Sequence, residues 1–421
     1  MKYKVYHCNS YNIHTIKTDR FKTTHMEVVF RNNATKENLP LYSFIADLIS
    51  ESTVNYPKKR DLVSKFEELY NTHIYATTSR VGASIFTNIN ADFINPEYIK
   101  DKDYLEEVIK LVFEIIKNPN ANNKEFNLKQ FNIIKERLRR EILSISENPV
   151  KESIRESIDL MNPNTATKYR LYGTIDNLDS ITPSSLYKAY EEFFKENLCD
   201  IFIIGNLDMD EVVCLINKYF DHRFIVEKDI SLLIDNKTTK KVKEGSRVSN
   251  NIQANMALIY NISDMTKYEK DIVFNVFNYI FGNGGLSSKL YQEIREKNSF
   301  CYGINSYYLK YDSLLLIQIS LDNANIKKAR SLVDKCLKEM IKGEFLDSTL
   351  NDAKENLINA LTLVNDNNMS ILNNYIFMEY DNIPLMDERK ELISKVTKKD
   401  IINVSKKIKL NTVFSLMGRS K

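Results

Sequence analysis

Apolar and polar positions along this 421-residue chain follow two periods, and the order in which the periods occur is repeated. A period near 3.6 residues predicts amphipathic helices, and strict alternation predicts half-buried strands. In the first half the pattern predicts helices around 41–50, 59–70, 104–117 and 124–146, strands around 73–80 and 83–91, a helix that begins at Thr182-Pro183, and a strand at 200–205. A proline just inside the start of a helix is typical of the first turn.

The second half repeats this order of elements. The pattern predicts helices around 267–281 and 287–297, strands around 300–309 and 313–321, helices around 325–342, 347–363 and from 393–400 onward, and a last strand at 412–418. The repetition predicts an α+β fold of two homologous domains, each a mostly antiparallel sheet with helices packed on one face. The predicted domains are 1–221 and 250–421. Residues 222–249 are rich in charge and poor in apolar periodicity, so we expect a solvated linker there.

Composition narrows the class of protein. A chain of this length is too long for one core, which favours two domains. There are 59 basic and 56 acidic residues, and this balance gives no electrostatic footprint for nucleic acid or for an anionic membrane. Five scattered cysteines argue against a disulfide framework or a structural zinc knot. No apolar run approaches the ~20 residues that span a bilayer, and the polar N-terminus has no signal core. We therefore expect a cytoplasmic protein.

One stretch carries candidate chemistry, the sequence LSSKLYQEIREKNSFCY from Leu286 to Tyr302, which follows a glycine-rich turn at 281–285. It places Arg295 near the end of a predicted helix and Tyr302 seven residues later in a predicted strand. It resembles the second-domain signature of the pitrilysin/insulinase-type metallopeptidases, the inverted-motif zinc enzymes. The resemblance implies that both side chains face the scissile peptide bond, where such donors stabilise developing negative charge. From the residues alone, a surface ion pair for the arginine and a core position for the tyrosine stay open.

The same family carries a zinc helix with the sequence His-x-x-Glu-His. Its downstream Gly-Thr…Tyr-Pro pattern is similar to Ser52-Thr53…Tyr56-Pro57 here, and this match places the three motif positions on Ser43, Ala46 and Asp47. A serine, an alanine and one carboxylate cannot supply the three protein ligands of a catalytic zinc. The family's distal zinc-binding glutamate corresponds to Glu141, although a charged helix could also expose this residue to solvent. We therefore expect no metal and no cofactor in this chain.

Other chemistries find little support in the sequence. The five histidines never fall at i, i+3 or i, i+4 on one predicted helix, so each is more typical of a surface or structural residue. The glycine-rich turn matches neither a P-loop nor G-x-G-x-x-G, and we expect it to be structural. No G-x-S-x-G elbow of a serine hydrolase is present.

The resemblance extends over essentially the whole chain and implies a division of labour. In short members of the family two subunits form a clamshell, and in some pairs one subunit binds zinc while the other supplies the Arg/Tyr pair. This chain would then be half of a clamshell: the non-zinc subunit of a heterodimeric metallopeptidase, which supplies Arg295 and Tyr302 in trans to peptide hydrolysis at the partner's zinc. It is similar to zinc-lacking insulinase-like proteins of Gram-positive bacteria that are associated with elongation factor P aminopentanol modification.

No stand-alone peptidase activity is expected from such a subunit. Its expected partners are a zinc-bearing homologous subunit and a peptide substrate, and a homodimer stays open. The alternative is a catalytically inactive pseudopeptidase that acts as a scaffold or as a peptide-binding protein.

Overall fold

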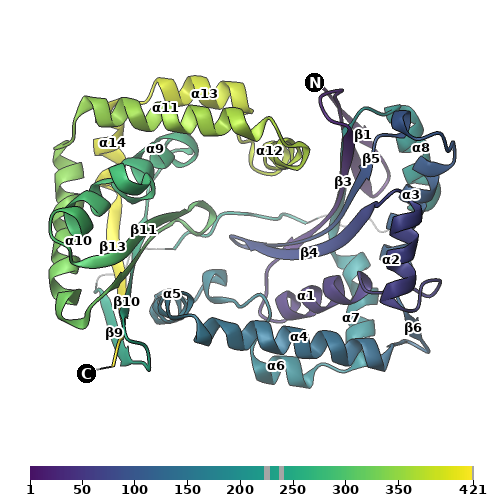
Figure 1. The fold of residues 1–421 in the computed structure, drawn as a ribbon, viewed down its shortest axis with the longest axis horizontal. Coiled ribbons are helices and arrows are strands. Elements are labelled where there is room, and N and C mark those ends of the chain that lie inside the picture. Colours follow the sequence, from purple (N-terminus) through teal and green to yellow (C-terminus); the bar gives the residue numbers. More distant parts are fainter. Residues whose placement is uncertain (222–227, 237–240, 420–421) are drawn as a thin grey trace. The chain divides into compact units, whose positions relative to one another are not determined.

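Two β-sheets form the centres of two structural units (Figure 1). The structure, a computed structural model, describes residues 1–221, 228–236 and 241–419. Unit 1 draws its described residues from Met1–Ile142, Tyr169–Ser231 and Asn365–Phe377, and unit 2 from Leu143–Lys168, Leu232–Val364 and Met378–Lys421.

The sheet of unit 1 has the strand order β1-β2-β8-β3-β5-β4. Its strands are β1 (Lys2–His7), β2 (Tyr11–Lys17), β3 (Thr23–Asn33), β4 (His73–Val81), β5 (Ser84–Ile94) and β8 (Leu198–Gly205). Its helices are α1 (Asn38–Ile49), α2 (Lys59–Glu68), α3 (Tyr104–Lys117), α4 (Leu128–Glu147, which enters unit 2 at residue 143), α6 (Ile175–Ser180), α7 (Pro183–Glu196) and α8 (Met209–Tyr219). Apolar side chains of α1, α3 and α7 share one core with alternate residues of β3 and β5, so these helices cover one face of the sheet.

The sheet of unit 2 has the strand order β11-β12-β10-β13-β9. Its strands are β9 (Lys243–Val248), β10 (Ala254–Ile262), β11 (Cys301–Leu309), β12 (Leu314–Leu321) and β13 (Ile408–Met417). A helical stretch around α9 (Phe274–Asn278), with π-type turns at Glu269–Val273, Tyr279–Asn283 and Tyr291–Glu296, packs on it together with α10 (Ile326–Lys342), α11 (Asp347–Val364), α13 (Met386–Ser394) and α14 (Lys398–Ser405).

The two sheets have the same topology. When β1 is set aside and the strands of each unit are numbered in chain order, both sheets follow the order 3-4-2-5-1. In both, the pair formed by the fifth and first strands is parallel (β8 with β2, β13 with β9) and the other neighbours are antiparallel. The predicted α+β fold with two homologous sheet-and-helix domains is confirmed.

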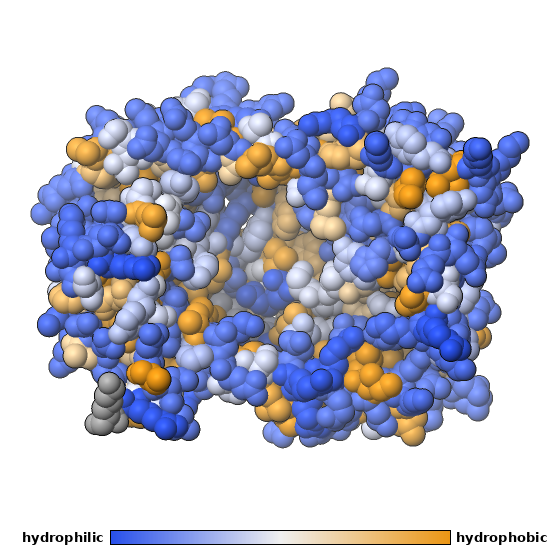
Figure 2. All heavy atoms as spheres, in the orientation of Figure 1, coloured by the Kyte–Doolittle hydropathy of each residue, from blue (hydrophilic) through white to orange (hydrophobic). Residues whose placement is uncertain are grey.

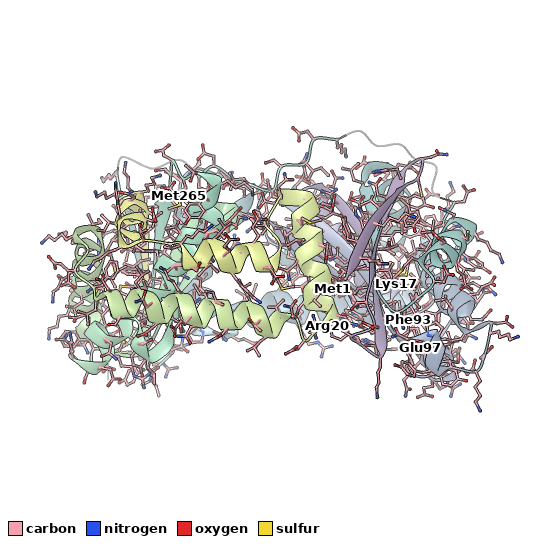
Figure 3. All side chains as sticks on the ribbon, turned by 90° about the horizontal axis from the view of Figure 1, so that it is seen from above. Met1, Lys17, Arg20, Phe93, Glu97 and Met265 are labelled. Carbon is pink, nitrogen blue, oxygen red and sulfur yellow. The ribbon has the colours of Figure 1, made fainter. Side chains whose placement is uncertain are left out.

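The second face of each sheet is covered by a segment from the other half of the sequence. In unit 2, helix α5 (Pro149–Leu160) packs on β10 and β13 and helps to bury a small apolar cluster around Ala257 and Ile259. In unit 1, the first part of α12 (Asn368–Asp381) stacks Tyr375 on the ring of Tyr3 at 4.8 Å. Arg20 lies beside this segment, 3.9 Å from Asp366 (Figure 3).

The domain bounds 1–221 and 250–421 describe the repeated blocks of the sequence and stay a prediction. The structural units do not follow these bounds, because residues 143–168 belong to unit 2 and residues 365–377 belong to unit 1.

The predicted linker needs correction. Residues 222–227 and 237–240 of it lie outside the described residues. The described remainder is not a solvated linker: Leu232, Ile234 and Asn236 are buried, and residues 243–248 form β9, which pairs with β13. The second repeat thus begins with β9, whose polar sequence Lys-Glu-Gly-Ser-Arg-Val gave no apolar pattern. Residues 243–248 form a strand because their backbone pairs with that of β13.

The expected structural role of the glycine-rich turn agrees with the local packing. A Cβ atom on Gly282 would lie 2.6 Å from Ser306 Oγ, and Gly285 has a φ of +62°. Hydrophilic side chains cover most of the face seen in Figure 2, with separate hydrophobic groups between them. Among the described residues, none of the helices has the length and apolarity needed to cross a membrane.

Candidate functional site

Helix α1 lies where the sequence predicts it and carries Ser43, Ala46 and Asp47, the residues that the resemblance places at the zinc-motif positions. Ser43 and Ala46 are buried, and the Ser43 hydroxyl donates to the carbonyl oxygens of Leu39 (2.8 Å) and Leu171 (3.1 Å). The serine hydroxyl therefore ties the helix to the 169–173 segment, and the alanine offers no polar atom. Of the three positions, only Asp47 keeps a side chain with metal-binding chemistry.

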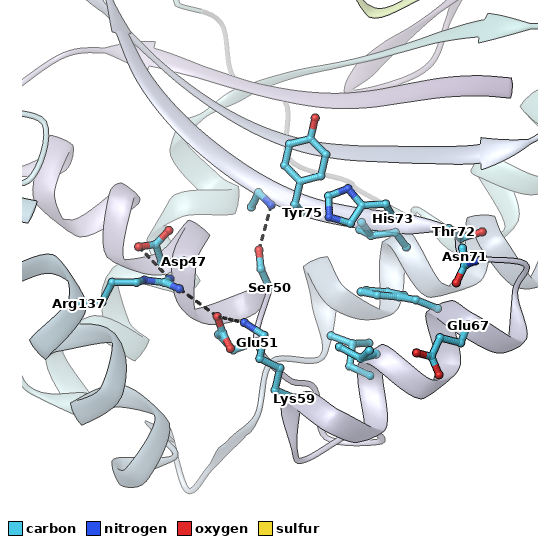
Figure 4. A pocket seen from close by; sticks show the side chains of 15 residues that line it. Asp47, Ser50, Glu51, Lys59, Glu67, Asn71, Thr72, His73, Tyr75 and Arg137 are labelled. Carbon is cyan, nitrogen blue, oxygen red and sulfur yellow. Dashed lines mark hydrogen bonds and ion pairs between the residues drawn. The ribbon is translucent and has the colours of Figure 1, made fainter. Parts of the chain in front are cut away.

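Asp47 is held by an arginine from a second helix. Arg137 on α4 places one guanidinium nitrogen 3.1 Å from Asp47 Oδ2 and donates from the other to Glu51 Oε1 at 3.1 Å. Lys59 donates to the same Glu51 oxygen at 2.9 Å, so two cations and two carboxylates form one chain of contacts (Figure 4). Burial raises the pKa of Asp47, the charge of Arg137 opposes the shift, and the nearby Glu51 and Glu141 add to it.

The structure brings Glu141 to this cluster. Glu141 stands one helical turn after Arg137 on α4, and its negative charge contributes to the raised pKa of both Asp47 and the half-buried Tyr172. For Tyr172, burial is the larger cause. Whether Glu141 is a relic of a zinc ligand stays a prediction, although its effect on Asp47, the third motif position, agrees with that interpretation.

These residues do not fit a catalytic zinc. Such a site needs three protein ligands of the histidine, cysteine or carboxylate type about 2 Å from the metal. Here one motif position is a hydroxyl engaged with carbonyls, one is alanine, and the third is bonded to a guanidinium. Among the described residues no group of three or more His, Cys, Asp and Glu side chains is placed to hold a metal ion. The residues at the three motif positions therefore do not supply the ligands of a catalytic zinc.

A pocket of about 500 Å³ opens beside this cluster, between α2 and β4. Its lining includes three apolar residues of α2, Leu62, Val63 and Phe66. It also includes Asp47, Glu51, Lys59 and Arg137, which are labelled in Figure 4. Strand β4 is the edge of its sheet.

The backbone N–H of Ala76 points away from β5, because it donates to Ser50 Oγ at 3.0 Å. Ile74, two residues before Ala76 on the same strand, also lines the pocket. Residues two apart on a strand point to the same side.

The predicted pair lies in unit 2, on the helical stretch before β11 and at the start of that strand. Tyr302 has 51% of its surface exposed, and its hydroxyl donates to both carboxylate oxygens of Asp322 at 3.1 and 3.0 Å. That hydrogen bond, with the charge of Asp322, raises the pKa of Tyr302. The tyrosine is thus not a core residue of its strand.

Arg295 is also exposed, and its guanidinium carbon lies 4.9 Å from the ring centre of Tyr291. The ion pair with a flanking glutamate that the sequence left open is not formed in the structure, where Glu293 pairs with Lys297 and Lys335. Burial raises the pKa of the Cys301 thiol to about 11, and the charge of Arg295 opposes this shift. Arg295 and Tyr302 thus lie on consecutive elements, the helical turn Tyr291–Glu296 and the strand β11, and their joint role stays a prediction.

Sequence reasoning missed two residues of these sites. Arg137 precedes Arg139 and Arg140 in a basic run that is typical of a solvated helix face, and only its i, i+4 relation to Glu141 indicates that it faces the same way. Asp322 follows β12 and meets Tyr302 only through the antiparallel pairing of β11 with β12. No local pattern marks it.

Fold and site together define a two-domain peptidase-like protein whose metal-binding motif has been replaced. Residues 180–357 match the family described as the peptidase M16 inactive domain. The chain is 26% identical over 412 residues to a Bacillus subtilis protein named probable inactive metalloprotease YmfF, and the match covers 96% of this chain and 95% of that relative.

Solved structures agree with this match. A conserved protein from Enterococcus faecalis has a TM-score of 0.92 at 24% identity, with 98% of this chain and 97% of that chain covered. A peptidase M16 inactive domain from Pseudomonas fluorescens has a TM-score of 0.80 at 16% identity, with 100% and 99% covered. The chain is thus similar to M16-type peptidase relatives, and its resemblance to the pitrilysin/insulinase-type peptidases is confirmed.

Proposed function

We propose that this chain is the non-zinc subunit of a two-subunit metallopeptidase and that it supplies Arg295 and Tyr302 to a peptide bound at the zinc of a homologous partner. The observation that carries the proposal is the contrast between the two units. The zinc-motif positions that the resemblance assigns to unit 1 carry no histidine, whereas unit 2 has an exposed arginine on a helical turn and an exposed tyrosine on the strand that follows it.

The proposed roles follow from the chemistry of peptide hydrolysis. Negative charge develops on the carbonyl oxygen as water adds, and a preorganised donor at that oxygen lowers the barrier. The hydroxyl of Tyr302 can be such a donor if it turns from Asp322, to which it donates in this structure, to the substrate oxygen. The guanidinium of Arg295 is permanently charged and offers several donors to a backbone carbonyl or a carboxylate of the substrate.

The proposed location of this pair of subunits is the cytoplasm. The five cysteines are all free in the structure, and three of them are buried. Free thiols agree with a reducing compartment.

The test is a mixing experiment with a zinc-bearing M16 homologue from the same organism. Each chain is purified alone, the two are mixed, and cleavage of a pool of unstructured peptides is followed by mass spectrometry. We expect association of the two chains and cleavage only in the mixture. Equal cleavage by the zinc-bearing chain alone, or two chains that do not associate, would contradict the proposal. The assembly left open for this chain would then be a homodimer.

A second function, the holding of peptides without hydrolysis, is favoured by the pocket between α2 and β4. It combines an apolar wall, charged side chains and the free edge of a sheet, which together suit an extended peptide. The two functions differ in one measurable respect. If this chain binds peptides with the same affinity in the presence and absence of the partner, and no cleavage accompanies association, peptide holding is the better account.

A further inference from the structure

We propose that Arg137 is a permanent cation in the place where an active relative holds its metal, so that the site has been rebuilt around a guanidinium. This inference goes beyond the proposed function, since it concerns unit 1 alone and needs neither a partner nor hydrolysis. It rests on the disagreement between the zinc motif that the family implies and the groups that occupy its positions.

The position of the guanidinium is the first argument. A metal bound through residue 47 would lie about 2 Å from its donor atom. In this structure the group in contact with that donor is a guanidinium nitrogen, 3.1 Å from Asp47 Oδ2. The other nitrogen reaches Glu51, which lies four residues after Asp47, just past the end of α1. A metal ion and this side chain therefore compete for one place.

Charge is the second argument. Asp47 and Glu51 are both partly buried, each lies 3.1 Å from a nitrogen of Arg137, and the exposed Glu141 follows Arg137 by one helical turn. The two partly buried carboxylates need a cation, since they would otherwise lie beside each other as like charges. A catalytic metal supplies that charge in a metalloenzyme, whereas Arg137, which cannot lose its proton, supplies it here at every pH of interest.

The neighbouring Arg139 is a matched control. It lies two residues further along α4 and also forms ion pairs, with Glu136 and Asp179. Because residues two apart on a helix point in different directions, Arg139 does not face the Asp47 cluster. A substitution at residue 139 removes the same charge from the same helix and leaves the cluster intact.

The experiment rebuilds the zinc motif with and without the arginine in the full-length chain. Variant one carries S43H, A46E and D47H; variant two adds Arg137→Leu; variant three adds Arg139→Leu to the first three changes. Zinc affinity is measured by competition with a chromophoric chelator, and Co²⁺ absorption reports the ligand geometry. We expect variant two to bind zinc at least about a hundredfold more tightly than variants one and three, because a fixed positive charge at the site repels a divalent ion. Equal affinities of variants one and two overturn the inference.

A second measurement applies if the rebuilt motif prevents folding. Arg137→Leu and Arg139→Leu are each made in the otherwise unchanged chain, and thermal unfolding is followed with and without millimolar Mn²⁺. Removal of Arg137 leaves Asp47 and Glu51 without their shared cation, so we expect Mn²⁺ to raise the Tm of that variant by several degrees. It should leave the Tm of the unchanged chain and of the Arg139 variant where it was. No Mn²⁺ effect on Arg137→Leu, or the same effect on all three proteins, overturns the inference.

Discussion

His25 provides a sharp test of the physical picture of unit 1, because a charged histidine is buried in the sheet. Its side chain is fully buried on β3, with Nδ1 2.8 Å from Asp92 Oδ1 and Nε2 3.8 Å from Glu27 Oε2. Asn88 donates to the other oxygen of Glu27 at 2.6 Å. Burial alone would lower the pKa of His25, but its hydrogen bond to Asp92 and the nearby carboxylate of Glu27 outweigh burial and raise the pKa to about 9.

The sign of the pH effect follows from this direction. The pKa in the folded state lies above that in the unfolded chain, so the histidine stabilises the fold most below pH 6.5 and loses this contribution as the pH rises through 9. With pKa values of 6.5 and about 9, the contribution is about 2–3 kcal/mol at pH 7 and near zero at pH 10. The charges of Asp92 and Glu27 then remain without their cation.

The perturbation is His25→Gln, which keeps a hydrogen-bond donor for Asp92 but cannot become charged. Urea unfolding of both proteins is followed by far-UV circular dichroism at pH 7 and pH 10. Labelling of the buried Cys199 thiol on the nearby strand β8, quenched at one fixed pH and located by mass spectrometry, assigns the transition to unit 1. We expect the variant to be less stable by roughly 2–3 kcal/mol at pH 7 and by less than about 1 kcal/mol at pH 10. A loss of the same size at both pH values would refute the reasoning.

Two further predictions concern buried polar groups. Burial alone would raise the pKa of Asp200, but His14 and Arg31 (3.0 Å away) lower it to about 2. Asp200→Asn should therefore destabilise unit 1 by about 3–5 kcal/mol at neutral pH, and this difference should shrink as the pH falls from about 4 to 2; a urea series at pH 7 and pH 2.5 checks it, and a pH-independent difference would contradict it. Asn236, 1% exposed, donates to Asp312 O at 2.7 Å. Asn236→Ala should lower the stability of unit 2 by about 1–3 kcal/mol in the same assay, whereas a solvated linker would tolerate the change.

Elements with strong periodicity could be predicted from the sequence. The apolar stripe of residues 41–50 is α1, and the runs at 200–205 and 412–418 lie in β8 and β13. Thr182 caps α7 with Pro183 in its first turn, as predicted. The helix predicted from residue 124 begins only at Leu128, because Asn123 and Lys124 have positive φ values and turn the short β6–β7 hairpin (Ala121–Asn122 and Glu125–Phe126).

The missed elements depend on contacts between distant segments. Strand β3 shows no alternation, because its second face is buried as well and carries polar residues such as His25 and Glu27. The exchange of α5 and the start of α12 between the units has no local signal either. For the candidate site, Ser43, Ala46 and Asp47 lie on the predicted helix, while Arg137 could be recognised only from the contact of α4 with Asp47.

The central claim is that unit 2 acts on a peptide held at a partner's zinc. Removal of the Tyr302 hydroxyl tests this claim most directly. Cleavage by the complex is measured under single-turnover conditions with the unchanged chain, with Tyr302→Phe and with Tyr307→Phe. Tyr307 is the matched control, since it is also exposed and lies on the same strand β11. The account predicts cleavage slower by about 10²–10³ for Tyr302→Phe, with unchanged assembly and zinc content, and an unchanged rate for Tyr307→Phe. Equal rates for all three complexes would contradict it.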